Sequence, residues 1–293
     1  MDKLRKFQFI NSFALKLIAI ITMTIDHVGY LLSFYLPYND PKIMICRIIG
    51  RLALPLFCLG IAEGVIHRHN FKKYILRLGI VGSLISTAYI LMGEMNIWSF
   101  TEISSTGNIF IDLMLGAVAV FCLRKKEWYY KIIAILPIAF AFASEIATTC
   151  ECNGTVAIIW WIPYFLRTQY GVYGVSLILL FYFAYWASNA IIENYSSKLG
   201  LDKDVVFSSG SQRLITNLFL IAALAFGTFM YWICAQQFNL NVMSIQLYAL
   251  ITSALLLFYN GKQGYNKKWL QYGFYLYYPL HLLLLALIYL IIN

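Results

Sequence analysis

Long apolar stretches, each close to the length of a membrane-spanning helix, follow one another along the whole chain. A helix needs roughly 20 predominantly apolar residues to cross the hydrocarbon core of a bilayer. Nine stretches meet or approach this length, near residues 14–36, 43–66, 74–92, 108–123, 131–148, 171–192, 214–235, 242–259 and 270–292. The pattern predicts an all-α polytopic membrane helical bundle with nine spanning helices, forming one domain over residues 1–293.

A tenth apolar stretch, residues 154–166, is short and contains Pro163. We expect it to be a re-entrant or interfacial element, and ten spans are the alternative. Because Lys and Arg collect in cytoplasmic loops, the basic segment with Lys3, Arg5 and Lys6 places the N-terminus in the cytoplasm. If residues 154–166 do not cross, most other basic loops face the same side. We therefore expect a multi-pass protein of the cell membrane with its C-terminus outside.

Composition supports a membrane protein and narrows the function. Hydrophobic residues make up 61% of the 293 residues and charged residues 12%, whereas a soluble domain has about 25% charged residues. The net charge of +9 is typical of basic cytoplasmic loops, so lipid rather than nucleic acid is the expected environment. The first apolar stretch is long enough to span, so no cleaved signal peptide is expected. No His or Cys spacing resembles a metal site, so no metal is expected.

Asp26 and His27 lie in the first predicted span, where charged groups need a partner or a function. Adjacent helical residues point about 100° apart, so these two cannot face the same spot. His27 is a candidate general base that takes a proton from an attacking amine or hydroxyl. Asp26 would either orient the imidazole or pair with an arginine. The alternative is an Asp–Arg pair that joins two helices, with His27 as a packed polar residue.

Arg47 and Arg51 lie four residues apart in the second predicted span, so they share a helix face. Guanidinium groups bind carboxylates and phosphates in a forked geometry. Pro55 removes the hydrogen bond to the Arg51 carbonyl and is expected to bend the helix there. The alternative is that Arg47 simply extends to the interface, which is harder for the deeper Arg51.

Further candidates lie near the ends of other spans. Arg68, which follows the second span, is either an ordinary cytoplasmic basic residue or part of a rim that binds the phosphates of an anionic cofactor. Asp112 is a second acid at membrane depth and a candidate substrate contact. In the last span, Tyr278 lies one turn before His281, and both are candidates for a proton relay or a substrate contact. The alternative is an aromatic belt beside a hydrogen-bonded histidine.

Several sequence blocks run in one order from near residue 14 to the C-terminus. They include Ile25-Asp26-His27, Arg47-Ile48-Ile49-Gly50-Arg51, Tyr170-Gly171-Val172-Tyr173-Gly174, Gln246-Leu247-Tyr248 and Tyr277-Tyr278-Pro279-Leu280-His281. On these blocks the chain resembles the TraX family, membrane proteins named for a conjugal pilin acetylase. That family is similar to the membrane acyltransferases that include the type-3 acyltransferases and the lysosomal heparan acetyltransferase.

The resemblance implies an integral membrane acetyltransferase that uses acetyl-CoA as co-substrate. The acceptor would be an amine or hydroxyl on a peptide N-terminus, a glycan or a lipid, and its identity is not fixed by the family. His27 would be the catalytic base, with Asp26 balancing charge, and Arg47 and Arg51 would contact the anionic donor or the developing charge. The chain departs from the family at Gln169, where an acid is frequent, and residues 150–168 look like an insertion.

Two other classes of function stay open. A transporter or flippase for an anionic or amphipathic solute would use the same buried charges as a pathway. The chain shows no internal repeat, which weighs against the many transporters built from two related halves. A structural membrane subunit would use the charges to join helices. The sequence leaves open whether the protein forms oligomers.

Overall fold

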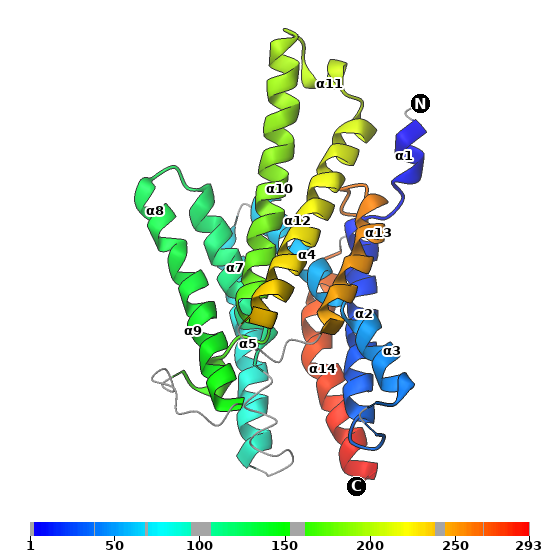
Figure 1. The fold of residues 1–293 in the computed structure, drawn as a ribbon, viewed down its shortest axis with the longest axis vertical. Helices are drawn as coiled ribbons and strands as arrows, with labels where there is room; N and C mark the ends of the chain where they lie inside the picture. Colours follow the sequence, from blue (N-terminus) through cyan, green and yellow to red (C-terminus); the bar gives the residue numbers. More distant parts are fainter. Residues whose placement is uncertain are drawn as a thin grey trace. The chain divides into compact units, whose positions relative to one another are not determined.

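The computed structural model describes residues 3–37, 39–67, 70–94, 107–152, 162–237, 244–265 and 267–292, and these residues fold into helices (Figure 1). Within these ranges there is no β-strand, and one isolated parallel bridge joins Ile10 to Tyr259. The helices, in chain order, are α1 (Lys3–Phe7), α2 (Ser12–Leu32), α3 (Pro41–Gly50), α4 (Ala53–His67), α5 (Phe71–Glu94), α7 (Ile109–Arg124), α8 (Trp128–Ile133), α9 (Ile135–Cys152), η1 (Tyr164–Leu166), α10 (Gly171–Lys198), α11 (Lys203–Val206), α12 (Ser209–Gln237), η2 (Ser244–Ile251), α13 (Thr252–Leu257) and α14 (Lys268–Ile292).

Short polar side chains begin the helices that carry the candidate residues. Asn11 accepts a hydrogen bond from the backbone N–H of Ala14 at the start of α2. Asp40 does the same for Lys42 at the start of α3, and Asn108 begins α7. These side chains satisfy N–H groups that have no partner within the helix. The helix ends are therefore encoded locally, next to the long apolar stretches.

Seven helices in the described part of the chain are long and apolar enough to cross a membrane. They correspond to seven of the nine predicted spans. The other two predicted spans are shorter helices, α7 with 16 residues and the apolar stretch Ile245–Leu257. The multi-pass all-helical fold is confirmed, whereas the count of nine is not. Residues 154–161 of the tenth stretch lie outside the described residues, and its end forms the 3₁₀ turn η1.

The sequence predicts a bend caused by Pro55 near Arg51, and the structure has a break between two helices at that place. Helix α3 ends at Gly50 and α4 begins at Ala53, so Arg51 lies at the turn between them. The ring of Pro55 cannot donate a hydrogen bond to the carbonyl four residues earlier.

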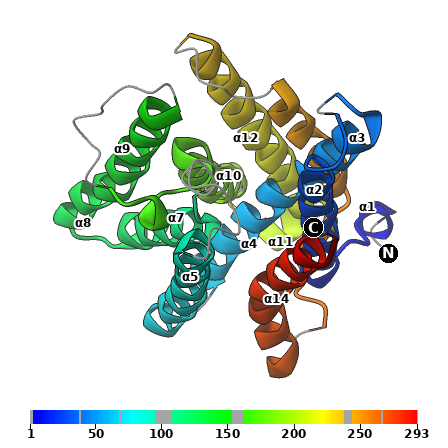
Figure 2. The same cartoon turned by 90° about the horizontal axis from the view of Figure 1, so that it is seen from below.

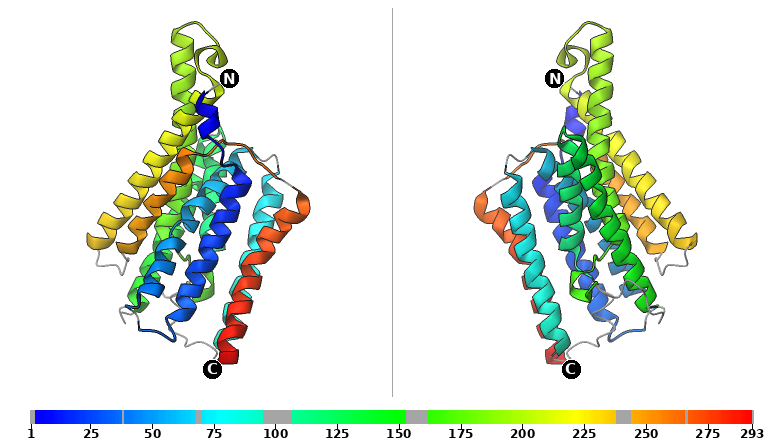
Figure 3. Two further views of the ribbon diagram at one scale, coloured as in Figure 1. Left: turned by 90° about the vertical axis from the view of Figure 1, so that its right-hand side faces the viewer. Right: turned by 90° about the vertical axis from the view of Figure 1, so that its left-hand side faces the viewer.

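The chain divides into two compact units, and each is described by itself. Unit 1 contains Met1–Gly60, Leu180–Gln236 and Val242–Asn293. In it, α2 lies between α3 and α14 (Figure 2). Helices α2 and α14 run in the same direction, so the two chain termini lie at opposite ends of this unit (Figure 3). Unit 1 brings together the first span, the second span and the last span, which carry most of the candidate residues.

Unit 2 contains Ile61–Leu179 and Gln237–Asn241. Helix α7 packs between α5 and α9, and η1 packs against α5. At the centre of this unit Gly116 of α7 touches Ile178, where an added Cβ would lie 2.3 Å from the isoleucine Cδ1. Small residues allow this close approach of helices. One domain over residues 1–293 stays a prediction.

Candidate functional site

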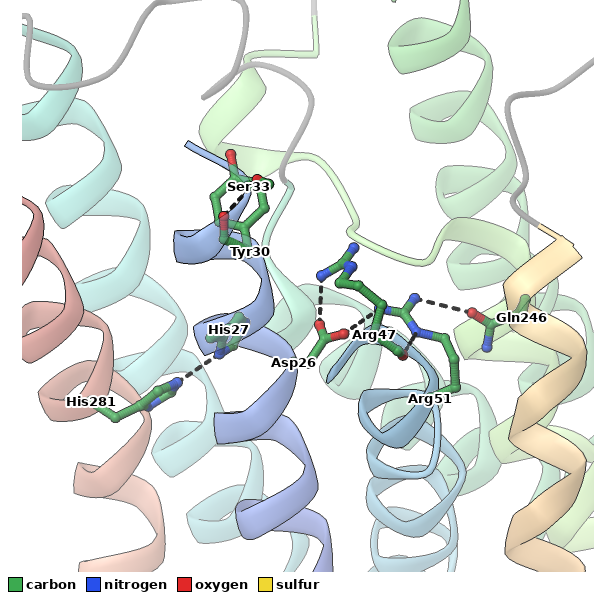
Figure 4. A network of polar contacts seen from close by, with 8 residues as sticks. All are labelled: Asp26, His27, Tyr30, Ser33, Arg47, Arg51, Gln246 and His281. Atoms are coloured by element: carbon green, nitrogen blue, oxygen red, sulfur yellow. Dashed lines mark hydrogen bonds and ion pairs between the residues drawn. The ribbon is translucent and has the colours of Figure 1, made fainter. Parts of the chain in front are cut away.

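His27 and His281 form a direct hydrogen bond between α2 and α14. Nδ1 of His27 lies 2.8 Å from Nε2 of His281, and the two rings stack with centroids 4.9 Å apart. Figure 4 shows His27 pointing from α2 toward α14. The two histidines predicted from separate spans therefore belong to one pair.

The hydrogen bonds of this pair define which nitrogen of His27 can accept a proton. Nδ1 of His281 lies 3.0 Å from the carbonyl oxygen of Tyr277, which can only accept, so this nitrogen carries the hydrogen. In the neutral ring Nε2 of His281 is then an acceptor. Nδ1 of His27 must donate to it. The lone pair of His27 consequently lies on Nε2, which is the atom able to act as a base.

Two tyrosines of α14 surround the histidine pair. The ring of Tyr278 meets both imidazoles edge-on, with centroids 6.1 Å from His27 and 5.3 Å from His281. Tyr277 stacks on His281, and its hydroxyl lies 2.8 Å from Oγ1 of Thr24. Tyr278 was predicted near His281. Thr24 was missed, although its spacing of three residues before His27 places it on a nearby part of α2.

Asp26 faces the other side of α2 and pairs with both predicted arginines (Figure 4). Its Oδ2 accepts from Nη1 of Arg47 at 2.9 Å, and its Oδ1 accepts from Nη2 of Arg51 at 2.7 Å. Asp26 does not contact the imidazole of His27 in this geometry, so its role is charge pairing rather than orientation of the base. Of the two roles expected for Asp26, the pairing with an arginine is the one found.

Close packing of α2 and α3 holds these groups in place. A Cβ added at Gly50 would lie 2.3 Å from the Asp26 carboxylate, and one at Gly29 would lie 2.5 Å from Cβ of Cys46. Nε of Arg51 donates to the carbonyl of Arg47 at 3.2 Å. Glycine at both positions lets the helices approach, and the guanidinium groups are thereby placed against one carboxylate.

Gln246 of η2 completes this set of side chains. Its Oε1 accepts from Nη1 of Arg51 at 3.3 Å, and the residue is buried. We call Asp26, Arg47, Arg51 and Gln246 the arginine cluster. Gln246 belongs to a sequence block that resembles the TraX family, but no role was predicted for it. A single amide in an apolar stretch is a weak signal, because its partner Arg51 lies 195 positions away in the chain.

Asp112 has a different environment, in unit 2. It is fully buried, and its two oxygens accept from the backbone N–H groups of Gln169 at 2.7 Å and Tyr170 at 3.2 Å. Glu145 accepts from the N–H of Val172 at 3.0 Å. Both acids therefore bind the start of α10, where backbone N–H groups lack helical partners and the helix dipole is positive. This geometry gives Asp112 a capping role, and its contact with a substrate stays a prediction.

The glycines of this turn are required by the same arrangement. Gly171 has a φ of +53°, and an added Cβ would lie 2.6 Å from an oxygen of Glu145. At Gly174 an added Cβ would lie 3.2 Å from Oδ1 of Asp112. The Tyr-Gly-Val-Tyr-Gly block thus has a structural explanation within unit 2.

The structure brings together six of the eight predicted site residues in unit 1, on two sides of α2. His27, His281 and Tyr278 lie on one side, and Asp26, Arg47 and Arg51 lie on the other. Asp112 belongs to unit 2. Arg68 lies outside the described residues. The roles assigned to these residues in chemistry stay predictions.

Comparison with known proteins identifies the family. Residues 12–226 match the family described as TraX protein. The chain is 25% identical over 286 residues to the probable fimbrial assembly protein FimC, serogroup H1, of Dichelobacter nodosus, covering 94% of both chains. It is also 27% identical over 176 residues to an uncharacterized protein of Rickettsia prowazekii (strain Madrid E), covering 58% of this chain and 54% of that one. No solved structure matches.

The family match covers more than half of the chain and includes the helices that carry Asp26, His27, Arg47 and Arg51. The similarity to the Dichelobacter protein extends over nearly the full length of both chains. The resemblance seen in the sequence blocks is therefore confirmed. This multi-pass helical membrane protein belongs to the TraX family.

Proposed function

We propose that this protein is an integral membrane acetyltransferase that moves an acetyl group from acetyl-CoA to an amine or hydroxyl acceptor. The observation that carries the proposal is the hydrogen bond from His27 Nδ1 to His281 Nε2. It leaves the lone pair of His27 on Nε2, as a general base requires. Membership of the TraX family supports the same class of reaction.

One base, His27, is enough to take up and return the proton in the proposed reaction. Nε2 of His27 takes the proton from the acceptor as its nitrogen or oxygen attacks the thioester carbonyl carbon. The carbon–sulfur bond then breaks, and the leaving thiolate receives the proton from His27. The products are the acetylated acceptor and coenzyme A, and His27 returns to its neutral form.

His281 acts through His27 in this scheme and is a positioning residue. It accepts the Nδ1 hydrogen of His27 and would stabilise the imidazolium that forms when Nε2 is protonated. The edge of Tyr278 against both rings restricts their orientation. Tyr278 and His281 are also proposed to contact the substrate.

Arg47 and Arg51 are proposed to contact the anionic donor or the negative charge that develops on the thioester oxygen. Their two guanidinium groups share one carboxylate, so the cluster favours negative ligands. Arg68 is proposed to contact donor phosphates. No metal is proposed in the reaction.

We propose that the protein lies in the cell membrane with its N-terminus in the cytoplasm. In unit 1, basic residues occur at the end that holds the N-terminus, in α1 and in the loop of Lys262, whose carbonyl accepts from the N–H of Ser12. The parallel course of α2 and α14 supports a C-terminus on the opposite side (Figure 3). Acetyl-CoA would then enter from the basic end.

We propose a chemical class for the acceptor of the acetyl group. The Dichelobacter relative is named as a probable fimbrial assembly protein, which makes a protein amine the first acceptor to test. Glycans and lipids with free hydroxyl or amine groups are the other candidates.

The test is acetyl transfer in purified membranes supplied with acetyl-CoA that carries a labelled acetyl group. Peptides, glycans and lipids are then searched for the label by mass spectrometry. Wild type should label a defined acceptor, and His27→Ala should reduce this labelling by roughly 10²–10⁴-fold, as expected for loss of a general base. His67→Ala is the matched control, because His67 is exposed at the end of α4.

Each result has a clear consequence. Normal labelling by a correctly inserted His27→Ala protein would contradict the base assignment. If wild type leaves acetyl-CoA intact in the presence of every acceptor class but moves an anionic solute across vesicles, the transporter or flippase is the better function.

A further inference from the structure

A second hydrogen bond links α2 to α14, about one helical turn before the histidine pair. The hydroxyl of Tyr277 lies 2.8 Å from Oγ1 of Thr24. Thr24 precedes His27 by three residues in α2. Tyr277 precedes His281 by four residues in α14. Because the two helices run in the same direction (Figure 3), both hydrogen bonds fit one register of α2 against α14.

The direction of this hydrogen bond is fixed by the backbone of α2. Oγ1 of Thr24 donates its hydrogen to the carbonyl oxygen of Ile20 at 2.8 Å. A threonine hydroxyl has one hydrogen, so Oγ1 can only accept from Tyr277. The Tyr277 hydroxyl is therefore the donor, and its hydrogen bond ties the position of the tyrosine ring to α2.

Tyr277 contacts His281 in two ways. Its ring is nearly parallel to the imidazole, with an interplanar angle of 11° and centroids 5.2 Å apart. Its carbonyl oxygen accepts the hydrogen on Nδ1 of His281 at 3.0 Å. Both contacts restrict how the imidazole can turn about its side-chain bonds. They direct Nε2 of His281 toward Nδ1 of His27.

The turn of α14 that carries these contacts contains a proline. Pro279 lies inside α14, between Tyr277 and His281. Proline has no N–H group, so this part of the helix lacks one backbone hydrogen bond. Prolines are a common cause of bends in helices. A side-chain hydrogen bond to α2 therefore supplies a restraint where the helix itself has lost one.

We infer that Thr24 and Tyr277 are positioning residues for His27. Their hydrogen bond holds the ring of Tyr277, and this ring orients His281. His281 in turn keeps the hydrogen of His27 on Nδ1, so that the lone pair stays on Nε2. The effect on the histidine pair depends on these contacts alone, and its consequence for catalysis rests on the proposed acetyl transfer.

The test observes the protonated nitrogens of the histidines directly. The full-length protein has four histidines. Labelling their rings with ¹⁵N gives distinct magnetic-resonance signals for protonated and unprotonated nitrogens, and the signals lost in His27→Gln or in His281→Gln identify the pair. Wild type at neutral pH should show His27 protonated at Nδ1 and unprotonated at Nε2.

Thr24→Val keeps the shape of the side chain but removes the acceptor for Tyr277. The fraction of His27 protonated at Nδ1 should fall. The kcat for labelled acetyl transfer should fall about threefold to tenfold, as expected for a lost neutral hydrogen bond. The KM for acetyl-CoA should change less than about twofold, because no contact with the donor is removed. Tyr277→Phe keeps the ring but removes the donor, so it should have the same effects.

Three further variants separate positioning from general damage. Thr24→Ser keeps the hydroxyl and should behave like wild type. Thr24→Val combined with Tyr277→Phe should lower kcat no further than either change alone, because both remove the same hydrogen bond. Thr22→Val is the matched control in α2. The hydroxyl of Thr22 donates to the carbonyls of Ile18 and Ala19 within the same helix, so its loss should leave the spectrum and kcat unchanged.

The outcomes separate this inference from the proposed function. An unchanged histidine spectrum in Thr24→Val and Tyr277→Phe overturns the inference, even if the unfolding temperature or acetyl transfer falls. An equal change of the spectrum in Thr22→Val overturns it as well. If the spectrum changes as expected but wild type transfers no acetyl group, the positioning role stands and the acetyltransferase proposal fails. If Thr24→Val does not fold, Tyr277→Phe decides.

Discussion

Asp26 and Asp112 are both buried acids in apolar helices, yet different kinds of group bind them. Asp26 in unit 1 faces two guanidinium groups, and Asp112 in unit 2 accepts two backbone N–H bonds. The first arrangement places two guanidinium groups beside one carboxylate, and Gln246 accepts a hydrogen bond from one of them. In the second arrangement both oxygens have partners from the start of a helix, which is the geometry of a cap.

This contrast shows that a charged residue at membrane depth is not by itself a sign of chemistry. Such residues are functional candidates by default. Asp112 has backbone partners that explain its burial, whereas Asp26 forms ion pairs with two side chains of the neighbouring helix and turn. The partners of the acid, rather than its depth, separate the two roles.

Asp26→Asn should have the largest effect. It removes the negative charge that Arg47 and the buried Arg51 share. Breaking a buried ion pair in this way costs about 3–5 kcal/mol. We expect a large loss of unfolding temperature and of labelled acetyl transfer. A stable, active Asp26→Asn protein would show that the ion pairs are dispensable and that the two acids are less different than they appear.

The two arginines should differ in their contribution. The Arg51 side chain is 8% exposed and that of Arg47 is 21% exposed, and Arg51 also bonds Gln246. Arg51→Ala should therefore raise the KM for acetyl-CoA more than Arg47→Ala, by about tenfold or more for a lost charged hydrogen bond. The measurement is initial rate against donor concentration. The reverse order would place the donor nearer Arg47.

Asp112→Asn tests whether the buried acid of unit 2 has a structural role. Asparagine has the shape of aspartate but only one side-chain oxygen. Its NH₂ group therefore faces a backbone N–H and cannot accept a hydrogen bond from it. We expect a loss of about 1–3 kcal/mol in stability, seen as a lower unfolding temperature. Acetyl transfer per folded molecule should change less than about threefold. A folded but inactive variant would instead support the predicted substrate contact.

Glu145→Gln should have the smallest effect. Its amide oxygen can still accept from the N–H of Val172, and the attraction between a carboxylate and the helix N-terminus is lost. That attraction is worth about 0.3–1 kcal/mol. The unfolding temperature should fall slightly and transfer should be retained. A loss as large as that of Asp112→Asn would mean that Glu145 has a second structural role.

Much of the fold could be predicted, because the apolar stretches and the capping residues are local signals. Each predicted span contains a helix, and the break before Pro55 lies where the missing N–H requires it. The number of spans was less accessible, since α7 and the stretch Ile245–Leu257 are shorter than a typical crossing. The length of a short apolar helix does not show whether that helix crosses the membrane.

The candidate site was partly predictable for the same reason. Helical geometry places Asp26 and His27 on different sides of α2, and the spacing of Arg47 and Arg51 suits a shared partner. The sequence could not show that Asp26 takes both arginines, because this depends on the close contact of α2 and α3 at Gly50. It also gave no role to Gln246 and suggested one for Asp112 that the geometry does not require.

The amino-acid sequence alone thus establishes a TraX-like, multi-pass helical protein and the small set of polar residues that its apolar helices carry. Tertiary structure decides which of these residues meet. His27 bonds His281, and Asp26 forms ion pairs with Arg47 and Arg51. Gln246 accepts a hydrogen bond from Arg51, and Asp112 accepts one from the backbone before α10. The physical reason is that helix formation and spacing depend on neighbours within a few residues. Contacts between side chains 21 to 254 positions apart depend instead on the register in which whole helices pack.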